Sequence, residues 1–185
     1  MPRLFTALEI PAPIAMQLTL LQGGLPGARW IDRENFHITL RFVGDIEMSM
    51  ANELSYALER VKTEPFSLGL QNLDVFGSSK PHSLFAGVTR SEPLHSLQAE
   101  HERICQQIGL EAMTRKFRPH VTLARLRSAR TPDIAKYLSG LGGFQSPEFN
   151  VGRFVILSSR NSVGGGPYVV EESYQLIEKA ISDAN

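Results

Sequence analysis

The strongest constraint on the fold of this 185-residue chain is an internal duplication. The tetrapeptide His-Ile-Thr-Leu at residues 37–40 recurs as His-Val-Thr-Leu at 120–123, an offset of 83 residues. A Phe-x-Leu-Gly segment at 66–69 recurs as Phe-x-Val-Gly at 149–152 with the same offset. Segments that recur in the same order at a constant spacing indicate a repeated structural unit. We therefore expect two structurally equivalent halves.

Local patterns give both halves the same order of elements. Segments that alternate like strands are each followed by a proline that opens an apolar-periodic, helix-like stretch. We expect a β-α-β-α-β order in each half, and hence an α+β fold. The chain would form a single domain of two pseudo-symmetric lobes, approximately residues 1–78 and 79–185, whose antiparallel sheets face a central cleft. The expected strands are 3–9, 36–43, 66–75, 84–90, 119–125, 149–158 and 168–177, and the expected helices are 11–21, 49–62, 93–108 and 131–139. A glycine-rich loop at 161–167 is interpreted as a hairpin connector, because it joins two strands.

Each duplicated tetrapeptide falls in an expected strand, where residues i and i+2 point to the same side. His37 and Thr39 therefore share one face of their strand, and His120 and Thr122 share one face of the equivalent strand. The apolar residues of each tetrapeptide can anchor the strand to a core. We expect two imidazoles and two hydroxyls to converge on one small volume.

This set of groups is suited to the hydrolysis of a cyclic phosphate. A neutral histidine can take a proton from the attacking water, while a charged histidine can protonate the departing ribose oxygen. An unperturbed histidine titrates at about pH 6.5, so both forms are accessible near neutrality. Threonine hydroxyls can donate hydrogen bonds to the non-bridging phosphate oxygens.

A zinc site is the other common use of paired histidines, but it requires three or four ligands. The remaining histidines, His82, His95 and His101, have no spacing that completes such a site. His95 and His101 lie in the expected helix 93–108 and are interpreted as surface residues. We therefore expect no required metal and no cofactor.

The distribution of charge points to an anionic ligand. The formal net charge is zero, which excludes a general nucleic-acid coat protein. Residues 114–130 nevertheless carry six basic side chains and no acidic one, and they bracket His120. The six are Arg115, Lys116, Arg118, Arg125, Arg127 and Arg130. This stretch predicts a pocket that attracts anions.

Other features predict a cytoplasmic monomer with no obligate protein partner and no membrane association. Glu9 falls where an export signal needs its apolar stretch, and no apolar run approaches the ~20 residues of a membrane span. The one cysteine, Cys105, cannot form an internal disulfide and is interpreted as a buried thiol on a helix.

The residues around both motifs resemble the 2H phosphoesterase superfamily, which is named for two His-x-Thr/Ser-x motifs. Within it, the chain is most similar to bacterial LigT-like RNA 2′,3′-cyclic phosphodiesterases, historically called 2′-5′ RNA ligases. The resemblance covers nearly the whole chain. It includes Arg-Leu-Phe-Thr-Ala-Leu at 3–8, Trp30, Asn-Phe-His-Ile-Thr-Leu-Arg-Phe-Val-Gly at 35–44, Pro-Phe at 65–66 and Phe-Arg-Pro-His-Val-Thr-Leu-Ala-Arg at 117–125.

The resemblance implies a bilobal fold in which the two motifs face each other across a groove. It implies that His37 is the proton donor to the ribose O3′ and that His120 is the proton acceptor for water, which leaves a 2′-phosphate product. Thr39 and Thr122 carry over as phosphate contacts. Arg125 carries over less directly, because strict alternation points it away from Thr122 unless the strand twists or ends there.

Alternatives remain open at this level. We expect the substrate to be RNA with a 2′,3′-cyclic phosphate end or a small cyclic nucleotide. Reversible 2′-5′ RNA ligation uses the same residues, and a non-catalytic module could bind a nucleotide or an RNA end without turnover. Trp30, Phe36 and Phe85 are candidates for base stacking, but each is equally suited to the core.

Overall fold

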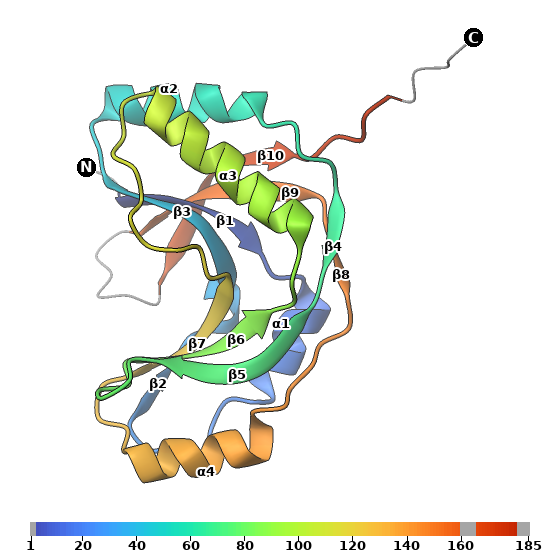
Figure 1. The fold of residues 1–185 in the computed structure, drawn as a ribbon. Coiled ribbons are helices and arrows are strands. Elements are labelled where there is room, and N and C mark those ends of the chain that lie inside the picture. Colours follow the sequence, from blue (N-terminus) through green and yellow to red (C-terminus); the bar gives the residue numbers. More distant parts are fainter. Residues whose placement is uncertain (1–2, 160–165, 181–185) are drawn as a thin grey trace.

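The chain folds around a bent antiparallel sheet that carries α2 and α3 at one end and α4 at the other (Figure 1). The computed structural model describes residues 3–159 and 166–180. Within these, the helices are α1 (Ala12–Thr19), α2 (Met48–Ala57), α3 (Glu92–Gln107) and α4 (Thr131–Leu141), with short 3₁₀ turns η1 (Arg33–Asn35) and η2 (Leu58–Arg60). The strands are β1 (Arg3–Glu9), β2 (Ala28–Trp30), β3 (His37–Asp45), β4 (Phe66–Leu68), β5 (Leu70–Phe76), β6 (Ser83–Val88), β7 (His120–Leu126), β8 (Phe149–Val151), β9 (Arg153–Ser159) and β10 (Tyr168–Gln175).

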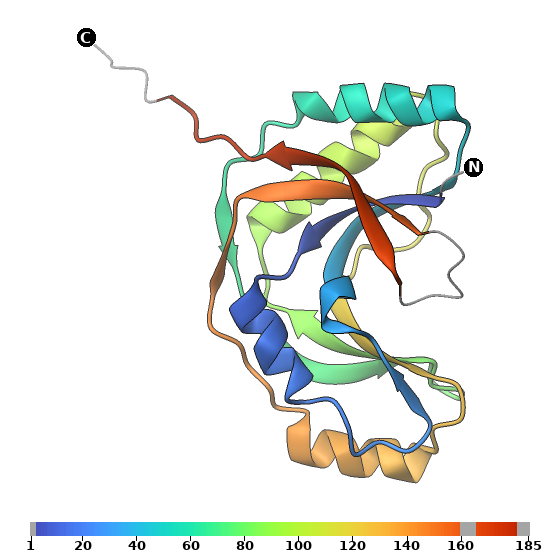
Figure 2. The same cartoon turned by 180° about the vertical axis from the view of Figure 1, so that it is seen from behind.

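The main sheet has the strand order β10-β9-β1-β3-β7-β6-β5, with β2 paired to β7. Its two parts meet between β3 and β7, which are joined through the pair Ile38 and Val121. The view from behind in Figure 2 shows the two parts diverging from this junction. The predicted α+β fold with antiparallel sheets is confirmed, and the two expected sheets are parts of one continuous sheet.

The predicted strands 66–75 and 149–158 are each interrupted by a glycine, at Gly69 and Gly152. Before the glycines, β4 and β8 pair with each other in a separate two-stranded sheet. After them, β5 pairs with β6, and β9 pairs with β1. Each part of the main sheet therefore combines strands from both sequence halves. The boundary expected near residue 78 therefore does not coincide with the division between the two parts of the sheet. Local alternation predicts strands, but it does not predict which strands pair.

The alternation predicted for the two motifs is confirmed. Ile38 and Leu40 are 0% and 3% exposed, and Val121 and Leu123 are both 0% exposed. The histidine and threonine of each motif are half-buried on the other side of the strands. The apolar residues thus anchor the strands to the core and leave the polar pairs facing away from it.

Helix α3 shows where one prediction was wrong. Ser91 caps the helix by accepting a hydrogen bond from the Leu94 nitrogen at 3.2 Å. His95 is exposed as predicted, but His101 is 0% exposed. His101 lies on the same helix face as Leu94 and Cys105, and its Nδ1 pairs with the Thr6 hydroxyl at 2.8 Å. The i, i+4 spacing therefore buries it, and a partner on β1 satisfies one ring nitrogen. Cys105 is buried on α3, as predicted.

The predicted connector at 161–167 lies mostly outside the described residues. The strands that it joins, β9 and β10, pair antiparallel. None of the helices within residues 3–159 and 166–180 has the length and apolar character needed to span a membrane.

Candidate active site

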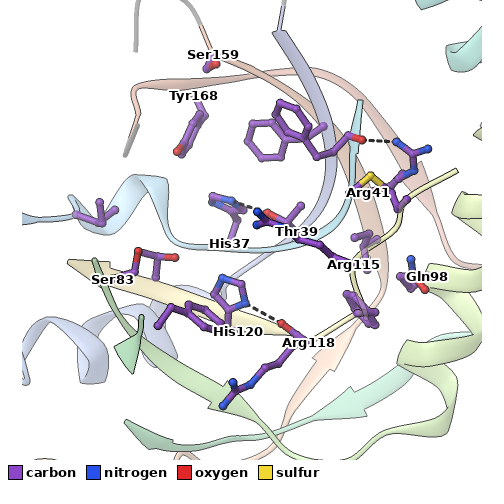
Figure 3. Close-up of a pocket in the computed structure, with 18 of the residues that line it drawn as sticks. His37, Thr39, Arg41, Ser83, Gln98, Arg115, Arg118, His120, Ser159 and Tyr168 are labelled. Atoms are coloured by element: carbon purple, nitrogen blue, oxygen red, sulfur yellow. Dashed lines mark hydrogen bonds between the residues drawn. The ribbon is translucent and has the colours of Figure 1, made fainter. Parts of the chain in front are cut away.

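A cavity of about 640 Å³ lies where β3 and β7 meet. All five residues singled out in the sequence line it: His37, Thr39, His120, Thr122 and Arg125. Figure 3 shows His37 and His120 facing each other from the two strands. The structure thus brings together groups that are 83 positions apart in the chain.

The two histidines are held by equivalent hydrogen bonds. His37 Nδ1 lies 2.8 Å from the carbonyl oxygen of Asn35, and His120 Nδ1 lies 2.8 Å from that of Arg118. A carbonyl oxygen can only accept, so each Nδ1 must carry the proton. Each Nε2 is then the nitrogen that can accept a proton when the ring is neutral, or donate one when it is charged.

The surroundings of His37 favour its neutral form. The ring contacts Phe5 and Tyr168, with centroid separations of 5.0 and 5.1 Å. Burial lowers the pKa of His37 to about 4, although the backbone hydrogen bond opposes this shift. The charges of His120 and Arg125 lower the pKa further. His37 is therefore uncharged near neutral pH in the ligand-free protein.

His120 has an aromatic environment of the same kind. Its ring lies 4.8 Å from Phe76 and 5.4 Å from Phe85, and these two phenyl rings stack on each other. The guanidinium of Arg118 lies over both rings, at 5.1 and 5.2 Å. Burial is the main cause that lowers the pKa of His120, and the charges of Arg118 and Arg125 add to it. An anion bound between the histidines opposes both shifts, because it stabilises the charged ring.

The two threonines of the motifs share the cavity with the histidines. The Thr39 hydroxyl lies 3.1 Å from Nε2 of His37. It donates to this nitrogen when the ring is neutral, and it can turn to a ligand when the ring is protonated. Thr122 is half-buried on the equivalent strand and lines the same cavity.

Arg125 reaches the cavity because β7 contains a bulge. Thr122 pairs with Phe85 and Ala124 pairs with Leu84, which leaves Leu123 without an opposite residue. The extra residue shifts the alternation by one position, so Arg125 lies on the same side as Thr122. Its Nη1 donates to the Ser83 hydroxyl at 3.1 Å. Strict alternation alone does not predict this position.

The sequence analysis missed several residues of the site. Phe5, Phe76 and Tyr168 flank the histidines, but no local motif marks them. A third recurrence, of Leu-Phe at 4–5 and again at 84–85, could have drawn attention to Phe5, because it places Phe5 and Phe85 in equivalent strands.

None of the three proposed stacking residues lines the cavity. Phe36 is buried in the core, and Trp30 packs against Tyr137 at 6.0 Å. Phe85 is buried and contacts the His120 ring at 5.4 Å, but it does not line the cavity either.

The cavity is strongly cationic. Among the described residues that line it, six carry a positive charge and none is Asp or Glu. The six are Arg3, Arg41, Arg115, Lys116, Arg118 and Arg125. In the described part of the chain, no group of three or more His, Cys, Asp or Glu side chains is arranged to hold a metal ion. The arrangement can bind a phosphate anion and transfer protons on two sides of it.

Comparisons with known proteins show a family and a shared fold. A family model described as LigT-like phosphoesterase matches residues 8–85 and 88–168. The chain is 32% identical over 152 residues to an RNA 2′,3′-cyclic phosphodiesterase of Aquifex aeolicus, covering 79% of this chain and 81% of that protein. It is 29% identical over 176 residues to the protein of the same name from Thermotoga maritima, covering 91% and 92%. Among solved structures, E. coli LigT complexed with 3′-AMP has a similar fold, with a TM-score of 0.78, 23% identity, and coverage of 96% of this chain and 100% of that chain.

Proposed function

Because the chain belongs to the family of LigT-like phosphoesterases, we propose that it is an RNA 2′,3′-cyclic phosphodiesterase that leaves 2′-phosphate ends. The names of the relatives support this activity. The observation that carries the mechanism is the matched pair of hydrogen bonds from Nδ1 of His37 and His120 to backbone carbonyls. These bonds leave both Nε2 atoms available for proton transfer at one cavity.

In the proposed reaction, water attacks the phosphorus atom and the bond from phosphorus to O3′ breaks. Nε2 of His120 takes the proton from the attacking water, and Nε2 of His37 gives a proton to the departing O3′. The product carries a 2′-phosphate and a free 3′-hydroxyl. Each histidine ends in the opposite protonation state, and exchange with solvent resets the pair.

The donor role places a demand on His37. Its pKa of about 4 in the free protein means that few molecules carry the proton at neutral pH. The negative charge of the cyclic phosphate raises this pKa when the substrate binds, because it stabilises the imidazolium. The substrate thereby promotes the protonation state that its own cleavage requires.

Thr39, Thr122 and Arg125 would hold the phosphate. Hydroxyl and guanidinium donors stabilise the non-bridging oxygens, whose charge increases in the transition state. These groups, together with the acid–base pair, account for every proton and charge in the reaction. We therefore propose that it needs neither a metal nor a cofactor. A cytoplasmic, monomeric enzyme is part of the same proposal, in keeping with the single buried thiol of Cys105.

The test is to incubate the protein with an oligonucleotide that ends in a 2′,3′-cyclic phosphate and to identify the product by ³¹P NMR and mass spectrometry. We expect a terminal 2′-phosphate, and a strongly reduced amount of it with the double variant His37→Ala/His120→Ala. A 3′-phosphate product would show that O2′ is the leaving group and would overturn the assignment of the proton donor. Tight binding without turnover would favour a binding module.

A further inference from the structure

One end of the cavity is organised by a buried arginine. Arg41 is 4% exposed, and its guanidinium donates hydrogen bonds to the carboxylate of Glu102 and to the carbonyl oxygens of Phe42 and Glu111. These bonds tie β3 to α3 and to the loop at 110–119. Although Arg41 lines the cavity, its guanidinium donors bind these protein groups, which form the wall at this end of the cavity.

The loop at 110–119 is anchored on both sides of its tip. The Met113 nitrogen donates to the carboxylate bound by Arg41, at 2.9 Å, and Phe117 packs edge-on against His95 of α3 at 5.4 Å. Arg115 and Lys116 lie between these anchors, are exposed, and line the cavity. In the view of Figure 3, Arg115 lies toward Gln98 and away from Ser83, with the histidines between.

The partners of the cavity's cations distinguish Arg115 and Lys116 from the others. Arg3 and Arg118 each face an aspartate, at 3.5 and 3.9 Å, and Arg125 donates to a serine hydroxyl. Within the part of the chain that the structure describes, Arg115 and Lys116 make no hydrogen bond or ion pair. They are therefore two unpaired positive charges on a fixed loop beside a cavity without carboxylates.

An exposed aromatic ring borders the same end. Phe42 is 46% exposed and lines the cavity, and Arg41 bonds its backbone to the wall described above. A bulge at Leu40, equivalent to the bulge at Leu123, directs Phe42 to this side. A half-exposed phenyl ring beside an anion site is suited to stacking with a nucleobase.

We propose that this end of the cavity binds the nucleotide that precedes the cyclic-phosphate end of an RNA chain. The phosphate linking the two nucleotides binds Arg115 and Lys116, and the base of the preceding nucleotide stacks on Phe42. Because the cyclic phosphate closes the 3′ end, any further phosphate of the substrate lies on the 5′ side. The inference rests on the proposed function and assigns the substrate class as an RNA end in preference to a cyclic mononucleotide.

Three substrates separate the phosphate from the base: adenosine 2′,3′-cyclic phosphate, the same compound with a 5′-phosphate, and the dinucleotide ApA ending in a 2′,3′-cyclic phosphate. We expect kcat/KM to rise roughly tenfold with the 5′-phosphate and further with the dinucleotide. In Arg115→Gln/Lys116→Gln, kcat/KM for the 5′-phosphorylated compound and for the dinucleotide should each fall by roughly tenfold relative to kcat/KM for adenosine 2′,3′-cyclic phosphate. In Phe42→Leu, the gain from the dinucleotide over the 5′-phosphorylated compound should be lost, while the gain from the phosphate remains.

Two control variants carry matched changes at exposed positions that do not line the cavity. Arg127→Gln/Lys136→Gln removes the same charge as the double variant at the loop, and Tyr56→Leu removes an aromatic ring as Phe42→Leu does. They should keep the wild-type ratios. Equal kcat/KM for all three substrates, or unchanged ratios in the cavity variants, would overturn the inference while leaving the proposed function intact. If no substrate is turned over, the proposed function fails. The affinities of the same three uncleaved compounds for wild type and variants, measured by calorimetry, would then decide the inference.

Discussion

Ile38 and Val121 occupy equivalent positions in the two motifs and pair with each other across β3 and β7. An antiparallel pair of equivalent residues carries a local twofold axis between its strands. In this antiparallel register, His37 is opposite Thr122 and Thr39 is opposite His120. All four side chains lie on the side of the strands that faces away from the core. One apolar pair thus places both motifs at a single cavity, and the following predictions test what that cavity does.

Replacing either His37 or His120 with Ala should lower kcat/KM on a cyclic phosphate by about 10²–10⁴-fold, as expected for loss of general acid–base catalysis. The double variant should lose much less than the product of the two single effects, because the pair acts as a unit. Initial rates with one oligonucleotide substrate measure this, and thermal melting provides the control for folding. Near-normal turnover in either single variant would point to a different catalytic residue.

A substrate with a better leaving group at the 3′ position should distinguish the two roles. Such a group needs less protonation as it departs, so His37→Ala should recover much of its lost rate. His120→Ala should not recover, because water still needs a base. The measurement compares both variants on the natural and the activated substrate. Equal rescue of the two variants would remove the assignment of donor and acceptor.

The pH optimum of kcat/KM should lie at a lower pH than two unperturbed histidines would give. The pKa values of His37 and His120 are both lowered, that of His37 to about 4, and catalysis needs one ring charged and the other neutral. We expect kcat/KM, which reports the free enzyme, to peak below about pH 6.5. The optimum of kcat should lie at higher pH, because the bound phosphate stabilises an imidazolium. Rates between about pH 4 and pH 9 at constant ionic strength test both statements. A kcat/KM optimum above that of kcat would contradict them.

Thr39→Val should lower kcat by roughly tenfold, because it removes a hydroxyl that hydrogen-bonds His37 and that, in the proposed mechanism, also contacts the phosphate. Thr39→Ser keeps the hydroxyl and should retain most of the activity. Steady-state kinetics on one substrate separate the two variants. Equal losses would indicate that the methyl group, and hence packing, is what the site needs from this residue.

Activity should survive chelation. The proposed mechanism relies on histidines, hydroxyls and arginines. Among the residues that the structure describes, no third ligand joins the two histidines to complete a zinc site. Turnover should therefore be unchanged after dialysis against EDTA and after addition of zinc or manganese. Loss of turnover in EDTA that is restored by either metal would refute the metal-free mechanism.

His101 should make the fold sensitive to acid. Burial lowers its pKa to about 3, so it stays neutral in the folded protein while the unfolded chain binds a proton below about pH 6.5. The free energy of unfolding therefore has its full value, as far as His101 is concerned, above about pH 6.5. It decreases as the pH falls toward 3, by up to about 1.4 kcal/mol per pH unit. In His101→Gln, the free energy of unfolding from urea titrations should depend less steeply on pH over this range. His95→Gln, at an exposed position of the same helix, should keep the wild-type slope.

Local sequence patterns determined much of the site. A period of two fixes the face shared by His37 and Thr39 and by His120 and Thr122, and the apolar residues between them fix the opposite face. The duplication then predicts that the two strands are equivalent. These features depend on neighbouring residues, so they can be read along the chain.

Other features were decided by contacts between distant segments. The bulge at Leu123 brings Arg125 into the cavity, and its position depends on pairing with β6. The exchange of strands after Gly69 and Gly152 depends on the pairing of β4 with β8. Local alternation carries no information about either choice of partner.

The electrostatic state of the site also belongs to the tertiary structure. The pKa of His37 follows from burial beside Phe5 and Tyr168, and that of His101 from burial on the helix face packed against β1. The sequence specified which residues can transfer protons. Only the folded chain set how readily they do so, because the free energy of a charged ring depends on how much water the surrounding side chains exclude.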